Sequence, residues 1–323
     1  MMNTMGKLIL LVVAFSLLCA CTVTQQATTS DESGMTGTLP ERTFRVVGYA
    51  TSAVIVDAIQ FDKLTHINYA FLIPNADGTF ELLANAWKLE QIVSRAHEHG
   101  AKVLISVGGW GWDTEFEMLA ASPETRATFV SELVQFVSEY NLDGADIGWE
   151  FPDPGQSAQN FIALMSELRA ALPDKLLTIA AVAYGETGGG IPDETFDLVD
   201  FVNIMAYDGE GTNHSSMEYA QQALDYWLGR GLPQDKAVLG VPFYARPNGT
   251  PYYNIIRVDP QAANVDFFTY YGVELNYNGI PTIQAKTRLA LERASGIMIW
   301  TIEHDVTNEL SLLSAIDRAV HGE

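Results

Sequence analysis

The feature that most constrains the fold is a repeated alternation of short apolar segments with longer amphipathic ones, which begins near Arg42 and continues through the rest of the chain. Near-continuous apolar runs separated by helical segments are typical of parallel strands that are covered on both faces. About eight such strand–helix units occupy roughly 280 residues, a length that favours a closed barrel over an open sheet. The sequence therefore predicts an α/β fold, a (β/α)8 TIM barrel in a single domain.

The segments of this alternation can be read directly from the apolar pattern. Strands are predicted at 44–50, 64–71, 102–109, 144–150, 176–183, 200–208, 237–244 and 296–301. Helices, with apolar residues three and four positions apart, are predicted at 87–100, 123–140, 161–172, 216–231, 282–294 and 309–319. Only about fifty residues separate Tyr244 from Gly296, which predicts a barrel without a large α+β insertion and with an open, shallow groove.

An open sheet that binds a dinucleotide is the main alternative fold. Such a sheet carries G-x-G-x-x-G after its first strand, because glycines let the backbone approach the pyrophosphate. Here that position reads GYATSAV. The sequence therefore implies no nucleotide cofactor, and it implies no other organic cofactor or metal.

Charge and cysteine content narrow the chemistry further. The chain of 323 residues is 48% hydrophobic and has a formal net charge of -22, which argues against nucleic acid as a partner and is compatible with a neutral polymer. Its two cysteines are Cys19 and Cys21, near the N-terminus. The barrel therefore has no disulfide, no thiol nucleophile and no cysteine-based zinc site.

The N-terminal segment has the pattern of a secretory signal, with Lys7 followed by an apolar run from Leu8 to Leu18. The run ends in Leu-Cys-Ala-Cys, which resembles a bacterial lipobox with Cys21 as the lipidated residue; an ordinary signal peptide is the alternative. We expect a lipoprotein signal peptide at 1–20, a flexible tether at 21–42 and the barrel at 43–323. This organisation predicts a protein anchored by lipid in the bacterial cell envelope, at the outer membrane or cell surface.

Candidate functional residues are found where the predicted strands end, because working residues of such barrels lie at the C-terminal ends of the strands. These residues are Tyr49, Phe71, Gly109, Trp110, Asp146, Glu150, Met205, Tyr207, Asp208, Tyr244, Arg246 and Trp300. Any one of the aromatic residues alone is explained by packing. Acids and several aromatic rings together predict a site for sugars, since ring faces stack on sugar rings and carboxylates bind hydroxyl groups.

The stretch DGADIGWEFP contains the strongest signal and an apparent gap. Side chains alternate along a strand, so Asp146 and Glu150 share one face with Gly148 between them. Strand geometry places the Cα atoms of the two acids about 13 Å apart. Two carboxylates therefore flank a position that has no side chain.

Five motifs, in order, resemble glycoside hydrolase family 18, the chitinases and related endo-β-N-acetylglucosaminidases. They are SVGGW (106–110), DGADIGWE (143–150), MAYD (205–208), GVPFYAR (240–246) and GIMIW (296–300). The resemblance extends over most of the chain from residue 44 onward. It implies β-1,4-linked N-acetylglucosamine polymers, such as chitin, or glycans that contain this sugar as the partner.

The resemblance also implies roles for individual residues. Glu150 would be the general acid, and the substrate's own acetamido oxygen would be the nucleophile. Tyr207 would bind the acetamido group beside Asp208, and Asp146 would influence the protonation of Glu150 from below. Trp300 would form the floor under the reacting sugar, and Trp110 would line the leaving-group side.

Gly148 departs from the family pattern, which has an aspartate at this position. That aspartate holds the acetamido N–H and stabilises the cationic intermediate, and glycine does neither. Three readings follow: a slow or altered hydrolase, a surface glycan-binding protein without turnover, or different chemistry on the same barrel. Glu303 and Asp305 follow the eighth strand and are further candidate carboxylates, whereas His214 and His304 are expected to be ordinary loop histidines.

Overall fold

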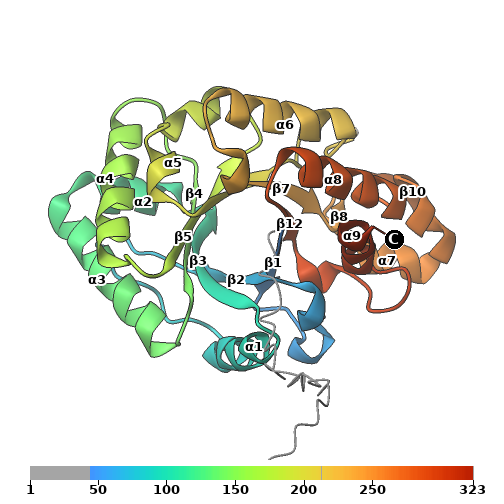
Figure 1. Ribbon diagram of the computed structural model, residues 1–323, viewed down its shortest axis with the longest axis horizontal. Helices are drawn as coiled ribbons and strands as arrows, with labels where there is room; N and C mark the ends of the chain where they lie inside the picture. Colours follow the sequence, from blue (N-terminus) through green and yellow to red (C-terminus); the bar gives the residue numbers. More distant parts are fainter. Residues whose placement is uncertain (1–43, 212, 323) are drawn as a thin grey trace, which may run out of the picture. The chain divides into compact units, whose positions relative to one another are not determined.

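The computed structural model describes residues 44–211 and 213–322, and these residues form a closed barrel of eight parallel strands (Figure 1). The strands are β1 (Arg45–Thr51), β2 (His66–Leu72), β3 (Lys102–Trp110), β4 (Gly144–Glu150), β5 (Leu176–Val182), β6 (Phe201–Met205), β7 (Ala237–Pro242) and β12 (Gly296–Trp300). Around the barrel the order is β1-β12-β7-β6-β5-β4-β3-β2, so each strand is hydrogen-bonded to two neighbours. The predicted (β/α)8 fold is confirmed.

Helices surround the strands, as Figure 1 shows in the view down the barrel. They are α1 (Ala86–Glu98), α2 (Asp113–Ala121), α3 (Pro123–Glu139), α4 (Gln156–Ala171), α5 (Thr195–Leu198), α6 (Met217–Gly229), α7 (Tyr252–Val258), α8 (Ile280–Arg293) and α9 (Leu312–His321). The start of α3 illustrates how the sequence sets a boundary. The Ser122 hydroxyl accepts the backbone N–H groups of Glu124 and Thr125, and Pro123 occupies the first turn, where it loses no hydrogen bond.

The apolar runs of the strands are buried because helices cover the outside of the barrel while side chains fill the inside. Strand β4 is buried from Gly144 to Trp149, and only its last residue, Glu150, is partly exposed. Its register against β3 pairs Ser106 with Asp146, Gly108 with Gly148 and Trp110 with Glu150. The acidic strand therefore passes from the barrel interior to the mouth within five residues.

Several predicted boundaries were wrong for local reasons. The strand predicted at 200–208 ends at Met205, and Asp208 has a positive φ of 59°, a turn conformation that no strand continues. The last helix begins at Leu312 rather than near residue 309, because the Ser311 hydroxyl caps it by accepting the Ser314 N–H. Helix α2 was not predicted, and the connection between β5 and β6 contains a short 3-10 helix (Glu186–Gly190) and the four-residue helix α5 in place of a long helix.

The chain between β7 and β12 contains small elements rather than a large lobe. Two hairpins, β8 (Tyr244–Ala245) with β9 (Thr250–Pro251) and β10 (Phe267–Tyr270) with β11 (Val273–Asn276), flank α7. Asn276 pairs in turn with Arg246, which attaches the second hairpin to the strand end of β7.

No helix within 44–211 or 213–322 is long and apolar enough to cross a membrane. The predicted signal peptide, the lipidation site Cys21 and the tether lie outside the described residues.

Candidate active site

Asp146 lies at the base of the site, fully buried inside the barrel. Its carboxylate accepts hydrogen bonds from Tyr49 (2.8 Å), Ser106 (2.8 Å), Thr178 (2.6 Å) and Asn203 (3.2 Å). Burial raises the pKa of this carboxyl, and the four hydrogen bonds oppose that effect. Since these bonds come from strands all round the barrel, Asp146 is fixed in place and cannot lean toward the mouth without breaking them.

Glu150 lies four residues further along β4, at the mouth. No hydrogen bond to its carboxyl group is found among the described residues, and burial raises its pKa to about 7, with the negative charges of Asp146 and Asp208 adding to the effect. The ordinary value is 4.5, so this carboxyl retains a proton at pH values where other glutamates are ionised. A carboxylic acid that is protonated near neutral pH is suited to donate that proton to a leaving group.

Gly148 leaves a gap between the two acids. Its φ is not positive, so the backbone would accept any residue. A Cβ atom at this position would lie 3.2 Å from the nitrogen of Gly109 and 3.3 Å from the carbonyl oxygen of Val107. A side chain therefore needs a shift of a few tenths of an ångström in β3, which is a small change rather than a block.

Tyr207 and Asp208 follow β6 and approach the acids from the other side. Burial raises the pKa of Tyr207, and the charge of Glu150 is the next largest contribution, which places the phenol within electrostatic reach of the acid. Asp208 forms an ion pair with Arg246, with 2.9 Å between Nε and Oδ1. Although burial favours its neutral form, hydrogen bonds with His214 and Tyr244 and the charge of Arg246 lower the pKa of Asp208 overall, so it stays ionised.

A buried lysine, which was not predicted from the sequence, holds the turn after β6 in place through hydrogen bonds. Lys286 on α8 is fully buried, and its Nζ donates to the carbonyl oxygen and the hydroxyl of Ser215, each at 2.6 Å, and to Oδ1 of Asn278 at 2.7 Å. The Ser215 hydroxyl donates to the carbonyl oxygen of Ala206, the residue before Tyr207. His214 is also buried, and its Nδ1 accepts the backbone N–H of Asp208, consistent with the expected loop role.

Aromatic rings line the space between these groups. Trp300 at the end of β12 stacks on Phe71, with ring centroids 5.6 Å apart and planes at 28°, and it also contacts Tyr49 at 5.4 Å. Gly109 permits this packing, since it has a positive φ of 88° and a Cβ there would lie 2.7 Å from the ring of Phe71. Trp110 is 79% exposed and pairs with Glu150 across the strands, so a flat apolar surface stands next to the acid.

The structure brings the predicted site residues together. One cluster contains Tyr49, Tyr207 and Tyr244, with Phe71, Met205 and Trp300 packed against it. Arg246 joins through Asp208, and Gly109 and Trp110 join through β3. Tyr49 is 2% exposed and uses its hydroxyl on Asp146, so it lies behind the aromatic surface. The roles assigned to these residues in substrate binding and catalysis stay predictions.

Within the part of the chain that the structure describes, no group of three or more His, Cys, Asp or Glu side chains has the arrangement of a metal site.

Comparisons with known proteins identify the family and agree with the fold of the barrel. The sequence profile of Glycosyl hydrolases family 18 matches residues 45–305. A family 18 chitinase from the chitin utilization locus of Flavobacterium johnsoniae shares 30% identity, with a TM-score of 0.74, over 87% of this chain and 94% of that one. A chitinase of Bacteroides thetaiotaomicron shares 26% identity, with a TM-score of 0.79, over 87% and 97%.

Curated relatives are matched over less of their length. Chitinase 1 of Aphanocladium album is 29% identical over 57% of this chain and 55% of that protein. A probable endochitinase of Caenorhabditis elegans is 33% identical over 61% of this chain, but only 38% of that protein is covered. The chain therefore spans about half or less of the length of these relatives.

Proposed function

Because the chain belongs to glycosyl hydrolases family 18 and is chitinase-like, we propose that it hydrolyses β-1,4-linked N-acetylglucosamine polymers or glycans, at a rate reduced by Gly148. The observation that carries this proposal is the environment of Glu150. Its carboxyl group is largely buried at the barrel mouth with a pKa of about 7, beside Trp110 on the neighbouring strand and within electrostatic reach of Tyr207.

The reaction requires a proton donor and a nucleophile. Glu150 donates its proton to the glycosidic oxygen as the bond to the anomeric carbon breaks. The carbonyl oxygen of the sugar's own acetamido group attacks that carbon and forms a cyclic oxazolinium cation. Water then attacks the anomeric carbon and gives its proton to Glu150, so the acid is regenerated and the anomeric configuration is retained.

Residues of the β6 end orient the acetamido group in this scheme. Among the described residues, the Tyr207 hydroxyl has a single weak contact, 3.8 Å to the sulfur of Met298, so it is free to donate to the incoming acetamido oxygen. Asp208 stays ionised beside it and contributes negative charge near the developing cation. Trp300 supplies the apolar face against which the reacting sugar stacks.

Gly148 removes one contact from the transition state. No carboxylate holds the acetamido N–H, and Asp146 is held by four hydrogen bonds below. Losing one charged contact typically lowers the rate by about 10²–10³-fold. The remaining groups support slow turnover with retention.

A sensitive assay on N-acetylglucosamine oligomers, with Glu150→Gln as the matched variant, tests the proposal. We expect measurable product from the native protein and at least a hundredfold less from the variant, which cannot donate a proton. Equal residual rates from the two proteins would refute hydrolysis through Glu150.

A glycan-binding protein without turnover is the second candidate. Two observations favour this candidate. Gly148 supplies no carboxylate to the site, and Asp146 is held by its hydrogen bonds and cannot take the place of the missing carboxylate. Calorimetry with N-acetylglucosamine oligomers distinguishes the two candidates. Heat of binding with no product over days supports the binding protein, and product that depends on Glu150 supports the enzyme.

We also propose that the protein is held in the bacterial cell envelope by acyl chains on Cys21, at the outer membrane or cell surface. The support is the apolar run before the Leu-Cys-Ala-Cys sequence. A Cys21→Ser variant is expected to leave the membrane fraction, and its unchanged fractionation would contradict this assignment.

A further inference from the structure

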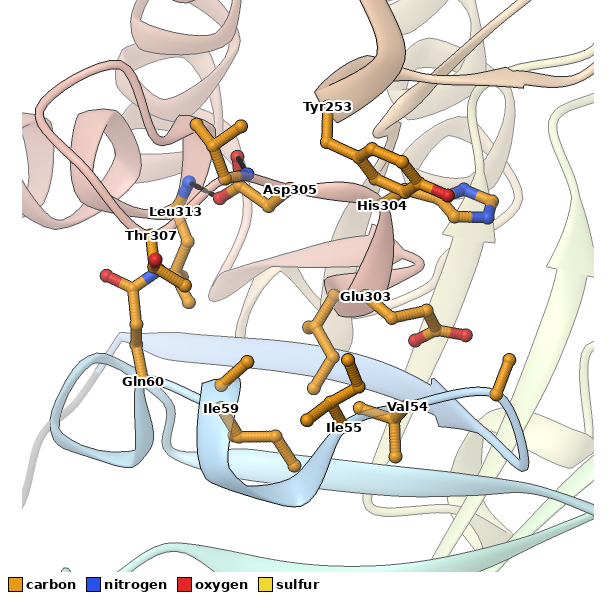
Figure 2. Close-up of a pocket in the computed structure, with 14 residues that line it drawn as sticks. Val54, Ile55, Ile59, Gln60, Tyr253, Glu303, His304, Asp305, Thr307 and Leu313 are labelled. Carbon is orange, nitrogen blue, oxygen red and sulfur yellow. Dashed lines mark hydrogen bonds between the residues drawn. The ribbon is translucent and has the colours of Figure 1, made fainter. Parts of the chain in front are cut away.

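A cavity of about 460 Å3 lies beside the proposed catalytic groove, between the chain after β1 and the chain after β12. Figure 2 shows its two walls: Val54, Ile55 and Ile59 along one side, and Tyr253, Glu303 and His304 across from them. One wall is therefore aliphatic, and the other carries the polar side chains together with Ile302, Val306 and Leu313. A volume of this size accommodates a small ligand.

The cavity adjoins the aromatic floor of the proposed active site. Trp300 ends β12, and Glu303 follows it by three residues, at most about 10 Å of chain. Tyr49, whose ring contacts Trp300, lies two residues before Thr51, which donates from both its backbone N–H and its hydroxyl to Glu303 Oε1. A polymer that is held on Trp300 can therefore extend toward this cavity.

The two carboxylates of the polar wall differ in what they bind. Asp305 accepts the N–H groups of Val306, Leu312 and Leu313 and the Ser311 hydroxyl, which occupies the carboxylate in holding the start of α9. Glu303 uses only Oε1. Its Oε2 is buried and has no hydrogen-bond partner within the described part of the chain.

None of the described residues that line the cavity is Lys or Arg, and Lys88, which does not line it, uses its Nζ on the backbone carbonyl oxygens of Ser52 and Val54. Two other polar atoms near Glu303 are buried without a hydrogen-bond partner among residues 44–211 and 213–322: the hydroxyl of Tyr69 and Nδ1 of His304. Burial raises the pKa of Tyr69 and the negative charge of Glu303 adds to it, so the hydroxyl oxygen stands in the field of the carboxylate. Glu303 Oε2 can only accept a hydrogen bond, whereas the Tyr69 hydroxyl and the His304 ring nitrogen can donate or accept one, and buried polar atoms without a partner are rare in native proteins.

We propose that this cavity binds a primary ammonium group carried on a sugar, that is, a glucosamine unit of a partly deacetylated polymer, with Glu303 as its counter-ion. The proposal rests on the proposed function, because it assumes that a glycan chain is held on Trp300. An ammonium group has three donors and no acceptor, so it can donate both to Glu303 Oε2 and to Nδ1 of His304, and both of these residues line the cavity. The aliphatic wall takes the apolar face of the ring and excludes water, which strengthens the attraction between the charges.

An acetylated unit is a poorer match for the same place. Its amide has a single N–H and no charge, so it cannot pair with both Glu303 Oε2 and His304 Nδ1 and gains no attraction between opposite charges. The acidic chain, with a net charge of -22, also favours a cationic ligand over a neutral one. Glu303 is thus inferred to determine which units of a mixed polymer occupy this end of the groove.

Calorimetry at pH 6 with a fully deacetylated glucosamine tetramer and the matching N-acetylated tetramer tests the inference. All proteins carry Glu150→Gln so that no cleavage occurs. In the added variant Glu303→Gln, the affinity for the glucosamine tetramer is expected to fall about tenfold or more, the usual size of one charge-assisted hydrogen bond, while the affinity for the acetylated tetramer changes less than twofold.

The control variant is Asp225→Asn, in which an exposed carboxylate on the outer helix α6 is replaced. It removes the same charge and should leave both affinities unchanged. Spermidine is the second control ligand. If it loses affinity in the Glu303 variant as strongly as the glucosamine tetramer does, or if the two tetramers respond alike, the cavity does not select an aminosugar and the inference is overturned.

Failure of this inference is distinguishable from failure of the proposed function. With Glu150 intact, the native protein and the Asp225→Asn control are expected to hydrolyse the acetylated tetramer at equal rates. Hydrolysis by the native protein together with no effect of Glu303→Gln on glucosamine binding would reject the cavity's role alone. Absence of hydrolysis in the native protein would reject the enzyme, while the binding difference would still stand or fall by itself.

Discussion

The ends of strands β4 and β6 both present a carboxylate to the barrel mouth, but in opposite electrostatic states. Asp208 after β6 is surrounded by His214, Tyr244 and Arg246, and its pKa is lowered. Glu150 on β4 has no hydrogen bond within the described chain, and burial with two negative neighbours raises its pKa to about 7. Two acids whose surroundings push their pKa values apart are suited to separate tasks, one to donate a proton and the other to remain charged.

The same comparison shows where the site is complete and where it is not. The β6 end is supported by two layers of hydrogen bonds, from His214 and from Lys286 through Ser215. The β4 end has a well-held Asp146 below, Glu150 above and Gly148 between them. We therefore expect the rate of hydrolysis to be limited by the missing carboxylate at Gly148 on β4, and not by the residues that follow β6.

The largest expected effect is a gain of function on β4. Gly148→Asp should raise the rate of hydrolysis of N-acetylglucosamine oligomers by about 10²–10³-fold, because a carboxylate would then hold the acetamido N–H and stabilise the cation. Initial rates of product release measure this gain.

Gly148→Asn is the matched control, since it introduces the same Cβ, 3.2 Å from the Gly109 nitrogen, without the charge. A gain in Asp but not in Asn assigns the effect to the carboxylate. No gain in either, with both variants folded, would show that the site has diverged beyond Gly148.

The second prediction concerns the hydrogen bonds by which Lys286 supports the turn after β6. Lys286→Met should lower the free energy of unfolding by about 3 kcal/mol, because three buried acceptors lose their donor. Urea unfolding measures the change, and Lys102→Met, which replaces a lysine with a 55% exposed side chain, is expected to be nearly neutral. An equally small effect of both substitutions would contradict the role of Lys286.

The raised pKa of Glu150 on β4 predicts that its replacement increases stability at high pH, whereas replacing Lys286 decreases it. The carboxyl of Glu150 has a pKa of about 7 in the folded protein and about 4.5 when unfolded, so the folded state binds the proton more tightly. Stability therefore falls as pH rises from 4.5 to 7, by about 3 kcal/mol at most. Glu150→Gln has no such proton, so it should be more stable than the native protein at pH 8 by up to that amount and nearly equal to it at pH 4.

Urea unfolding of the two proteins at both pH values checks this expectation. A Glu150→Gln variant that is less stable than the native protein at pH 8 would mean that the ionised carboxylate has a stabilising partner after all.

The barrel and the residues at its mouth were largely predictable from the sequence. Strand ends are marked by apolar runs that stop at unusual residues, and barrel topology then brings Glu150, Tyr207 and Trp300 to one mouth although 150 residues separate the first from the last. The end of β6 was misplaced, because Ala206 and Tyr207 continue the apolar pattern and nothing in it signals the turn at Asp208.

Contacts between distant segments were beyond the sequence. Lys286 appears as one polar residue on an amphipathic helix, where a lysine normally faces solvent, and only the packing of α8 against the β6 turn buries it. Glu303 and Asp305 were both candidate carboxylates without a direction. The structure separates them, since Asp305 holds the start of α9 and Glu303 lines the cavity.

The proposed hydrolysis depends most on the proton that burial keeps on Glu150. The pH dependence of kcat/KM for an N-acetylglucosamine oligomer tests the presence of this proton most directly. We expect kcat/KM to fall about tenfold per pH unit above a midpoint near pH 7, as the acid loses its proton in the free protein. A decline centred near pH 4.5, the ordinary value for a solvated glutamate, or a rate that does not change up to pH 9 would contradict the account.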